Sequence, residues 1–421
     1  MLKKFKKYAG SLGPGLVSGA ADDDPSGVAT YSQTGAQYGN QFLWVSFFTF
    51  PLMGMVQEMC ARIGIVTGRG LASNIRIRFP RIALYVCVAL LFTANTFNIG
   101  ADLAAMAEAS ALIYSAIPFF IYVGFFTILS LILQIFVPYK QYSQIIKYLT
   151  FILLVYVAEA FFVDINWADV FHSATLPRFD FSKDQILLLS ALLGTTISPY
   201  LFFWQTSQEV EEEIAHGKTT IMDRKGCEHR EQIHDMRVDV WSGMFFSNGV
   251  MFFIIAVCAV ALHQQGITTI NTAADAAEAL RPVAGNFAYA LFALGIIGTG
   301  LLAVPVLAGA SAYAIAETFR KKEGLYRKWR AAKTFYFVII VSMLVALGIT
   351  FSGISPIKTL LYSAILNGVV APVMLVFIVL LSNDKKVMGK YVNNTFQKLF
   401  GWFVVLVMLL ASVATLYYLF S

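Results

Sequence analysis

Long apolar runs are the feature of this sequence that most restricts its fold. A membrane-spanning helix needs about 20 consecutive apolar residues, and the chain contains eleven runs of roughly that length. Only 13% of its 421 residues are charged, about half the share found in soluble domains, so most of its surface must be covered by lipid. The runs occupy residues 10–38, 41–66, 82–113, 118–137, 145–163, 185–207, 240–262, 286–317, 334–351, 357–381 and 399–420.

The runs are continuously apolar, which favours helices over strands. The strands of a membrane β-barrel would alternate apolar and polar residues over about ten positions. Lipid offers no hydrogen-bond partner to a free backbone group, so spans of this kind are helical. The sequence therefore predicts an all-α polytopic membrane protein with eleven transmembrane helices, folded as a single domain over residues 1–421.

Basic residues predict the orientation in the membrane. With the N-terminus inside, all but Arg178, Lys183, Arg281 and Lys358 of the 31 Lys and Arg residues fall in the inner segments, as in cytoplasmic loops generally. This places the N-terminus in the cytoplasm and the C-terminus outside the cell. The net charge of +6 then lies in short loops, so we expect no nucleic acid partner. The longest inner segment, residues 208–239, is interpreted as a solvated amphipathic helix.

The first span departs from an ordinary apolar helix. Three consecutive aspartates, Asp22 to Asp24, precede Pro25 within it. Carboxylates inside a membrane are costly and usually mark an ion path, and proline removes a backbone hydrogen-bond donor. We expect a helix broken at mid-membrane, with free carbonyl groups before the break. The alternative is a loop, with the helix beginning only at Ser26.

The sixth span is interrupted in a similar way by Pro199, which follows Ser198 and two threonines. A lone proline usually only kinks a membrane helix. However, breaks in helices one and six have the spacing expected when five helices repeat in inverted orientation, and in such folds the two breaks bind a cation. The predicted repeats cover about residues 8–164 and 185–381, and an extra helix covers about 399–420.

Further polar residues lie in the third and tenth spans. Asn95, Asn98 and Asp102 lie close to helical spacing, so this stripe either joins the third helix to its neighbours or faces a cavity. In the tenth span Asn367 precedes a proline and is expected to face the same cavity.

These motifs resemble the Nramp family of divalent-metal transporters. Asp24 and Pro25 match the first half of the family motif Asp-Pro-Gly-Asn in helix one, and Pro199 matches Met-Pro-His in helix six. The segment 61–68, Ala-Arg-Ile-Gly-Ile-Val-Thr-Gly, resembles the family after helix two. The resemblance covers helices one to ten. It implies a LeuT-like 5+5 inverted repeat with helices 1 and 6 broken, and a secondary transporter rather than an enzyme.

The departures from the family motifs concern the metal ligands. Gly27 stands where the family has the ligand Asn, and Ser198 stands where it has the ligand Met. The pattern is closest to the Nramp-related magnesium transporters, a prokaryotic branch, which implies Mg2+ and also Mn2+ as substrates in the inner (plasma) membrane. A thioether favours softer metals, whereas Mg2+ prefers oxygen ligands and keeps several waters. Gly27 is expected to open space for such a hydrated ion.

The predicted site follows from these matches. The metal site is expected to comprise Asp24, Gly27, Ser198, Ala21, Thr195 and Ile197, and the cavity lining Tyr200, Asn95, Asp102 and Asn367.

A third group of departures concerns energy coupling. Where the family has titratable residues in helices three and six, this chain has Asn95, Ala105 and Tyr200. None of these three side chains titrates near neutral pH. Asp102 matches the family and is the titratable group that remains. We therefore expect uptake without proton coupling.

Several alternatives remain. The first is a proton-coupled Mn2+ or Fe2+ importer of the ordinary Nramp kind. Another is a symporter of organic substrates, which Asp24 disfavours because its charge would repel an anion. An intramembrane enzyme would need a nucleophile and a base, and the histidines lie outside the predicted spans. We expect no cofactor, since the cation is the substrate, and a monomer in the lipid bilayer.

Overall fold

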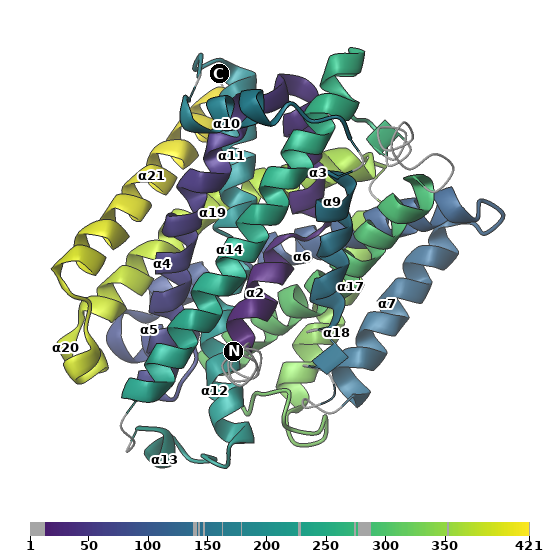
Figure 1. Cartoon of the computed structure of the whole chain (residues 1–421). Coiled ribbons are helices and arrows are strands. Elements are labelled where there is room, and N and C mark those ends of the chain that lie inside the picture. The colour runs from purple at the N-terminus through teal and green to yellow at the C-terminus, as the bar shows by residue number, and fades with distance from the viewer. Residues whose placement is uncertain are drawn as a thin grey trace, which may run out of the picture.

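The computed structural model describes residues 13–137, 141, 144–145, 148–161, 163–177, 179–225, 229–272, 275–276, 288–351 and 353–420. Within these residues all regular structure is helical, as predicted. Figure 1 shows long helices packed side by side, with α2 starting in the lower half of the molecule, above α12 and α13, and α21 finishing near the upper end.

The helices of the first half are α2 (Pro14–Asp22), α3 (Pro25–Tyr38), α4 (Trp44–Thr67), α5 (Leu71–Arg78), α6 (Arg81–Ile113), α7 (Phe119–Phe136), α9 (Leu154–Glu159) and α10 (Trp167–Thr175). Those of the second half are α11 (Lys183–Thr196), α12 (Pro199–Ala215), α13 (Ile221–Lys225), α14 (Arg230–Ala261), α17 (Ala288–Thr318), α18 (Lys333–Thr350), α19 (Pro356–Asn383), α20 (Lys385–Met388) and α21 (Thr395–Phe420). Short 3-10 turns cover Gly39–Phe42, Thr150–Leu153, His263–Gln265 and Gly389–Tyr391.

Membrane crossing is supported by the length and composition of these helices. Eight helical stretches in the described part of the chain are long and apolar enough to span a bilayer, and the stretch Lys183–Ala215 combines α11 and α12. The predicted fifth span, residues 145–163, lies partly outside the described residues. The number of eleven crossings therefore stays a prediction, as do the limits of the two repeats.

Both predicted helix breaks are confirmed, and each lies directly before a proline. The first break leaves Asp23 and Asp24 between α2 and α3, and the second leaves Ile197 and Ser198 between α11 and α12. Asp24 and Ser198 have extended backbones, with ψ of 172° and 132°. The proline ring disfavours a helical conformation of the residue before it and so favours both breaks, whereas Pro51, Pro305 and Pro372 lie inside continuous helices.

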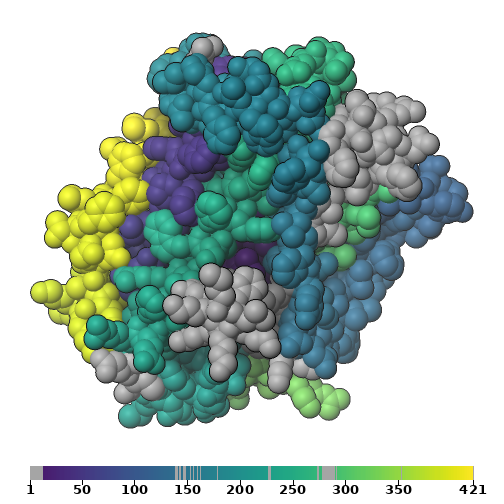
Figure 2. Space-filling model, in the orientation of Figure 1, coloured from purple at the N-terminus to yellow at the C-terminus, as the bar shows by residue number. Residues whose placement is uncertain are grey.

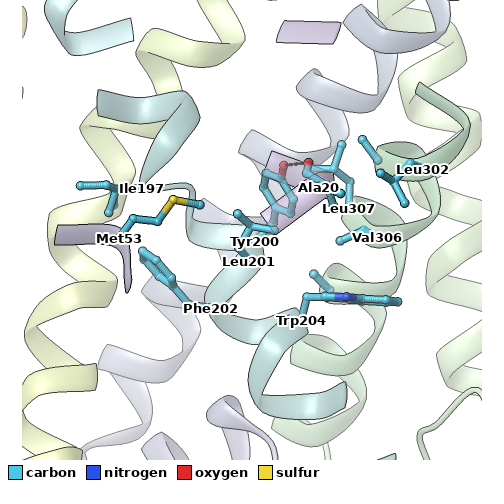
Figure 3. Packing of buried hydrophobic residues seen from close by; sticks show 14 of the residues in the cluster. Ala20, Met53, Ile197, Tyr200, Leu201, Phe202, Trp204, Leu302, Val306 and Leu307 are labelled. Carbon is cyan, nitrogen blue, oxygen red and sulfur yellow. Dashed lines mark hydrogen bonds between the residues drawn. The ribbon is translucent and has the colours of Figure 1, made fainter. Parts of the chain in front are cut away.

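The second broken helix lies in the middle of the molecule. Tyr200, Phe202 and Trp204 of α12 are all buried, and Figure 3 shows them pointing to different sides of the helix among apolar neighbours. In contrast, α7 and α21 lie at opposite edges of the view in Figures 1 and 2. These two helices expose large apolar side chains, such as Phe136 and Leu410, and such surfaces suit contact with lipid.

The segment 208–239 differs from its interpretation as a solvated helix. α12 continues to Ala215, and Glu209, Glu211 and Glu213 on it are buried. Glu211 accepts hydrogen bonds from the Tyr313 hydroxyl at 2.5 Å and from the backbone N–H of Leu325 at 2.8 Å. The interpretation was wrong for these carboxylates because different neighbours cover them. α17 and the loop after it cover Glu211, Glu209 lies against Gly64 of α4, and Glu213 accepts a hydrogen bond from Lys218 at 3.2 Å.

Glycines allow α2 to approach α14 very closely. A Cβ atom added at Gly19 would lie 2.3 Å from the carbonyl oxygen of Gly243, and one at Gly243 would lie 2.2 Å from that of Gly15. Small residues at membrane helix interfaces permit this backbone contact. Since α2 is only nine residues long, these contacts largely fix its position.

We expect Gly243→Ala to destabilise the protein by about 1–3 kcal/mol, because the added methyl group must push α2 away from α14. The measurement is the thermal unfolding midpoint of the purified protein in detergent. Gly249→Ala is the matched control, since Gly249 lies on the same helix with no atom within 4 Å of its added Cβ. Equal midpoints for the two variants would contradict the close contact.

Candidate metal-binding site

Asp24 lies at the first break and caps the helix that follows. Its Oδ1 accepts hydrogen bonds from the Ser26 hydroxyl at 2.6 Å and from the Gly27 N–H at 2.7 Å. Such a cap satisfies backbone donors that a helix start leaves unpaired. The carboxylate is buried and held in one orientation. Since Oδ1 already accepts two bonds and each carboxylate oxygen has about two lone pairs, a cation would bind at Oδ2.

Asn98 is the third hydrogen-bond partner of Asp24. Its side-chain amide donates to Oδ2 of Asp24 at 2.7 Å, and its own oxygen accepts from the Ser363 hydroxyl at 2.6 Å. This chain of hydrogen bonds joins α3, α6 and α19. The sequence assigns Asn98 only to a polar stripe and gives no sign of Ser363, because a serine in a membrane helix most often serves packing.

The helices beside the two breaks contact each other directly. The Tyr200 hydroxyl donates to the carbonyl oxygen of Ala21 at 2.7 Å, which is the dashed line in Figure 3. Beside them, a Cβ atom added at Gly27 would lie 3.0 Å from the Thr195 Oγ1. Gly27 was expected to open space for a hydrated ion, but Thr195 fills that space because the two broken helices pack together here.

Ser198 is bonded back to its own broken helix. Its hydroxyl donates to the carbonyl oxygens of Gly194 and Thr195, both at 2.8 Å. The hydroxyl proton is thereby turned away, and the lone pairs of the oxygen remain for another partner. Ile197 also lies in the break, with its N–H bonded to the carbonyl of Leu193 at 2.9 Å.

The residues predicted to line the cavity fall into two groups. Asn95 donates to the Leu307 carbonyl and to the Ser311 hydroxyl, both at 3.0 Å, so its amide is bonded to α17 rather than to either break. Asp102 and Asn367 are buried, and their side-chain polar atoms have no hydrogen-bond partner among the described residues. Buried polar groups without partners are uncommon and suit sites that hold water or an ion.

The other two aspartates lie beside Asp24 and are fully buried. Asp22 accepts from the Ser247 hydroxyl at 3.1 Å, whereas neither oxygen of Asp23 is hydrogen-bonded within the described part of the chain. The described residues contain no cluster of three His, Cys, Asp or Glu side chains arranged to hold a metal. A cation at Asp24 would therefore need backbone, hydroxyl or water oxygens as its other ligands.

A model of the family described as natural resistance-associated macrophage protein-like, Nramp, matches residues 15–418. The chain belongs to the Nramp family. The resemblance inferred from the motifs at the two breaks is thereby confirmed, and the protein is a divalent metal transporter rather than an enzyme. The metal is the transported substrate, and no cofactor is needed.

Among curated relatives, the divalent metal cation transporter MntH of Klebsiella pneumoniae strain 342 is 25% identical over 399 residues, which cover 94% of this chain and 90% of the relative. The protein of the same name from strain ATCC 700721 is 26% identical over the same shares of both chains. These alignments extend over nearly the whole transporter.

Two kinds of solved structure share the fold. The Eremococcus coleocola manganese transporter, in complex with an aromatic bis-isothiourea compound, superposes with a TM-score of 0.75 at 16% identity, over 98% of this chain and 87% of that one. Mhp1, a nucleobase-cation-symport-1 family transporter, gives 0.58 at 14% identity over 97% and 92%. The LeuT-like fold implied by the family resemblance is therefore confirmed.

We expect Asn98→Ala to weaken the binding of Mn2+ about tenfold, because the variant loses a hydrogen bond to a charged group that holds Asp24 in place. Isothermal titration of the purified protein measures the affinity. Asn95→Ala is the control, since Asn95 lies on the same helix but is bonded to α17. An equal loss in both variants would show that the Asn98–Asp24 bond has no special part in binding.

Proposed function

We propose that this Nramp transporter takes up Mn2+ or Mg2+ across the plasma membrane by alternating access, through a site whose ligands are all oxygen atoms. The observation that carries the proposal is the Asp24 carboxylate, buried at the first helix break and oriented by Ser26, Gly27 and Asn98. Burying a carboxylate in a membrane costs free energy, and such residues usually mark an ion pathway.

Mn2+ is the first candidate. The relatives support it, since one is named a manganese transporter and the others divalent metal cation transporters. They favour the manganese importer, the alternative drawn from the sequence, over magnesium as the main substrate. Carboxylate, carbonyl and water oxygens also suit Mn2+.

Mg2+ is the second candidate, and the residues at the second break support it. Ser198 and Thr195 offer hydroxyl oxygens there, and Ser198 occupies the position where the family motif has the thioether of Met. Without a sulfur ligand the site loses its preference for softer metals. Mg2+ is usually held by one or two carboxylates while it keeps several waters, and Asp24 can supply one carboxylate.

The test is uptake into proteoliposomes, with Mn2+ as the transported ion and Mg2+ or Cd2+ as competitor. We expect saturable Mn2+ uptake that Mg2+ inhibits better than Cd2+ does, because hard ions prefer oxygen ligands. Asp24→Ala should abolish uptake while the protein remains folded.

Two outcomes would contradict this proposal. Stronger competition by Cd2+ than by Mg2+ would show that the ligands are not all hard oxygens. Normal uptake by Asp24→Ala, together with loss of uptake in Asp22→Ala or Asp23→Ala, would move the site to a neighbouring aspartate.

We further propose that uptake is not coupled to protons. Tyr200 is bonded to Ala21 and Asn95 to α17, and neither titrates near neutral pH. The membrane potential alone can drive uptake, since moving a double charge inward gains about 4.6 kcal/mol per 100 mV. That energy supports accumulation on the order of a thousandfold.

A pH-sensitive dye inside proteoliposomes tests the coupling. With an imposed negative-inside potential and external Mn2+, we expect metal uptake without metal-dependent acidification of the lumen. Asp24→Ala proteoliposomes provide the control for the passive proton leak. Acidification that follows metal uptake and exceeds this leak would support the proton-coupled importer instead, with Asp102 as the first residue to examine, because it is a buried carboxylate without a described partner.

A further inference from the structure

Asp239 of α14 holds the start of α2 by three hydrogen bonds. Its Oδ1 accepts from the backbone N–H of Gly13 at 2.8 Å and of Leu16 at 3.1 Å, and its Oδ2 accepts from that of Gly15 at 2.7 Å. The side chain is buried. Pro14 has no N–H, so every backbone donor from residue 13 to residue 16 is bonded to this one carboxylate.

This arrangement is a helix cap supplied by another helix. The first N–H groups of a helix have no partner within it, and a side chain at the residue before the helix usually accepts from them. Gly13 occupies that position in α2 and has no side chain to do so. A carboxylate from α14, 224 residues away along the chain from Gly15, takes this part, and its charge also suits the positive end of the helix dipole.

The other end of α2 reaches the candidate site. Ala21, in its last turn, accepts the hydrogen bond of Tyr200, and Asp24 lies in the break that follows. α2 has nine residues and spans only about 13 Å. A displacement at its start therefore moves the carbonyl group of Ala21 and the aspartates at its end.

Release of an ion requires that some element moves, because the site is closed in this structure. Asp22 and Asp23 are fully buried, and Asp24 is 2% exposed. α2 is the element best suited to move, since only the two residues of the break join it to α3. Its contacts with α14 include close backbone approaches through glycines and the bonds to Asp239.

We propose that Asp239 is a positioning residue for transport: it docks α2 on α14 in the closed state, and its three bonds break when the site opens toward the end of the molecule where α2 begins. This inference rests on the proposed alternating access. It predicts that weaker docking raises the population of the open state, which lowers the apparent affinity for the ion without slowing the cycle.

The experiment compares Asp239→Asn, which has the same shape without the charge, with Asp239→Glu, which keeps the carboxylate. Asp235→Asn is the matched control, one turn earlier on α14 and exposed. All variants carry Ser18→Cys, placed at a fully buried position of α2, and Cys227→Ser, since the other three cysteines, Cys60, Cys87 and Cys258, are buried. A water-soluble thiol reagent then reports the opening of α2 in the absence of metal.

We expect Asp239→Asn to be labelled at Ser18→Cys about tenfold faster than the parent, because it loses charge-assisted hydrogen bonds. Its KM for Mn2+ should rise by a similar factor, about tenfold, while kcat is kept. Asp235→Asn should behave as the parent, and Asp239→Glu should regain part of the protection. A residue with a purely structural role would not separate KM from kcat in this way.

Labelling of Asp239→Asn at the parental rate, or a fall in kcat with unchanged KM, would overturn the inference. Failure of Asp239→Asn to fold would also overturn it, since an isosteric change should loosen α2 alone. Because the labelling needs no metal, it tests the docking independently of the substrate. Fast labelling without uptake of Mn2+ or Mg2+ would contradict the proposed function and leave the docking standing.

Discussion

Lipid has no hydrogen-bond partner for a free backbone group, and the two broken helices depend on this constraint. Each proline interrupts a helix deep in the protein, which leaves N–H and C=O groups that must be satisfied inside it. Asp24 caps α3, Ser198 bonds back to α11, and Tyr200 bonds to the carbonyl of Ala21. The same groups that make the breaks tolerable are thus the polar groups available to a cation.

In the closed site, some polar groups are hydrogen-bonded to neighbouring helices and others have no partner. Short hydrogen bonds connect the first break with α6 and α19 through Asn98 and Ser363, whereas Asp23, Asp102 and Asn367 have no partners among the described residues. Unpaired buried carboxylates and amides lower stability. An ion or ordered water bound at these groups would supply the missing hydrogen bonds and remove this loss of stability. A transporter must also release its ion, so its site has to exist in an empty form.

The sequence predicts those features of the site that are local in the chain. Asp24 beside Pro25 and Ser198 beside Pro199 predict both breaks, because a proline acts on its immediate neighbour. The sequence does not predict the partners from distant helices. Asp239 reads as a charge in an inner loop, yet it caps α2, and Glu211 reads as a solvated carboxylate, yet Tyr313 and Leu325 cover it. Such pairings depend on which helices pack together. A hydrophobic pattern shows which face of a helix is buried but not which helix covers that face.

The departures from the family motif at the two breaks are not independent of each other, because Gly27 at the first break lies against Thr195 beside the second. Gly27 cannot simply accept a side chain in this arrangement, since Thr195 occupies the space where it would begin. The Ala21 carbonyl already accepts a bond from Tyr200, which leaves one lone pair for an ion. An oxygen that is shared in this way is a weaker ligand than a free one. On the proposed function, such a site would compete poorly for the whole hydration shell of Mg2+, which dehydrates reluctantly.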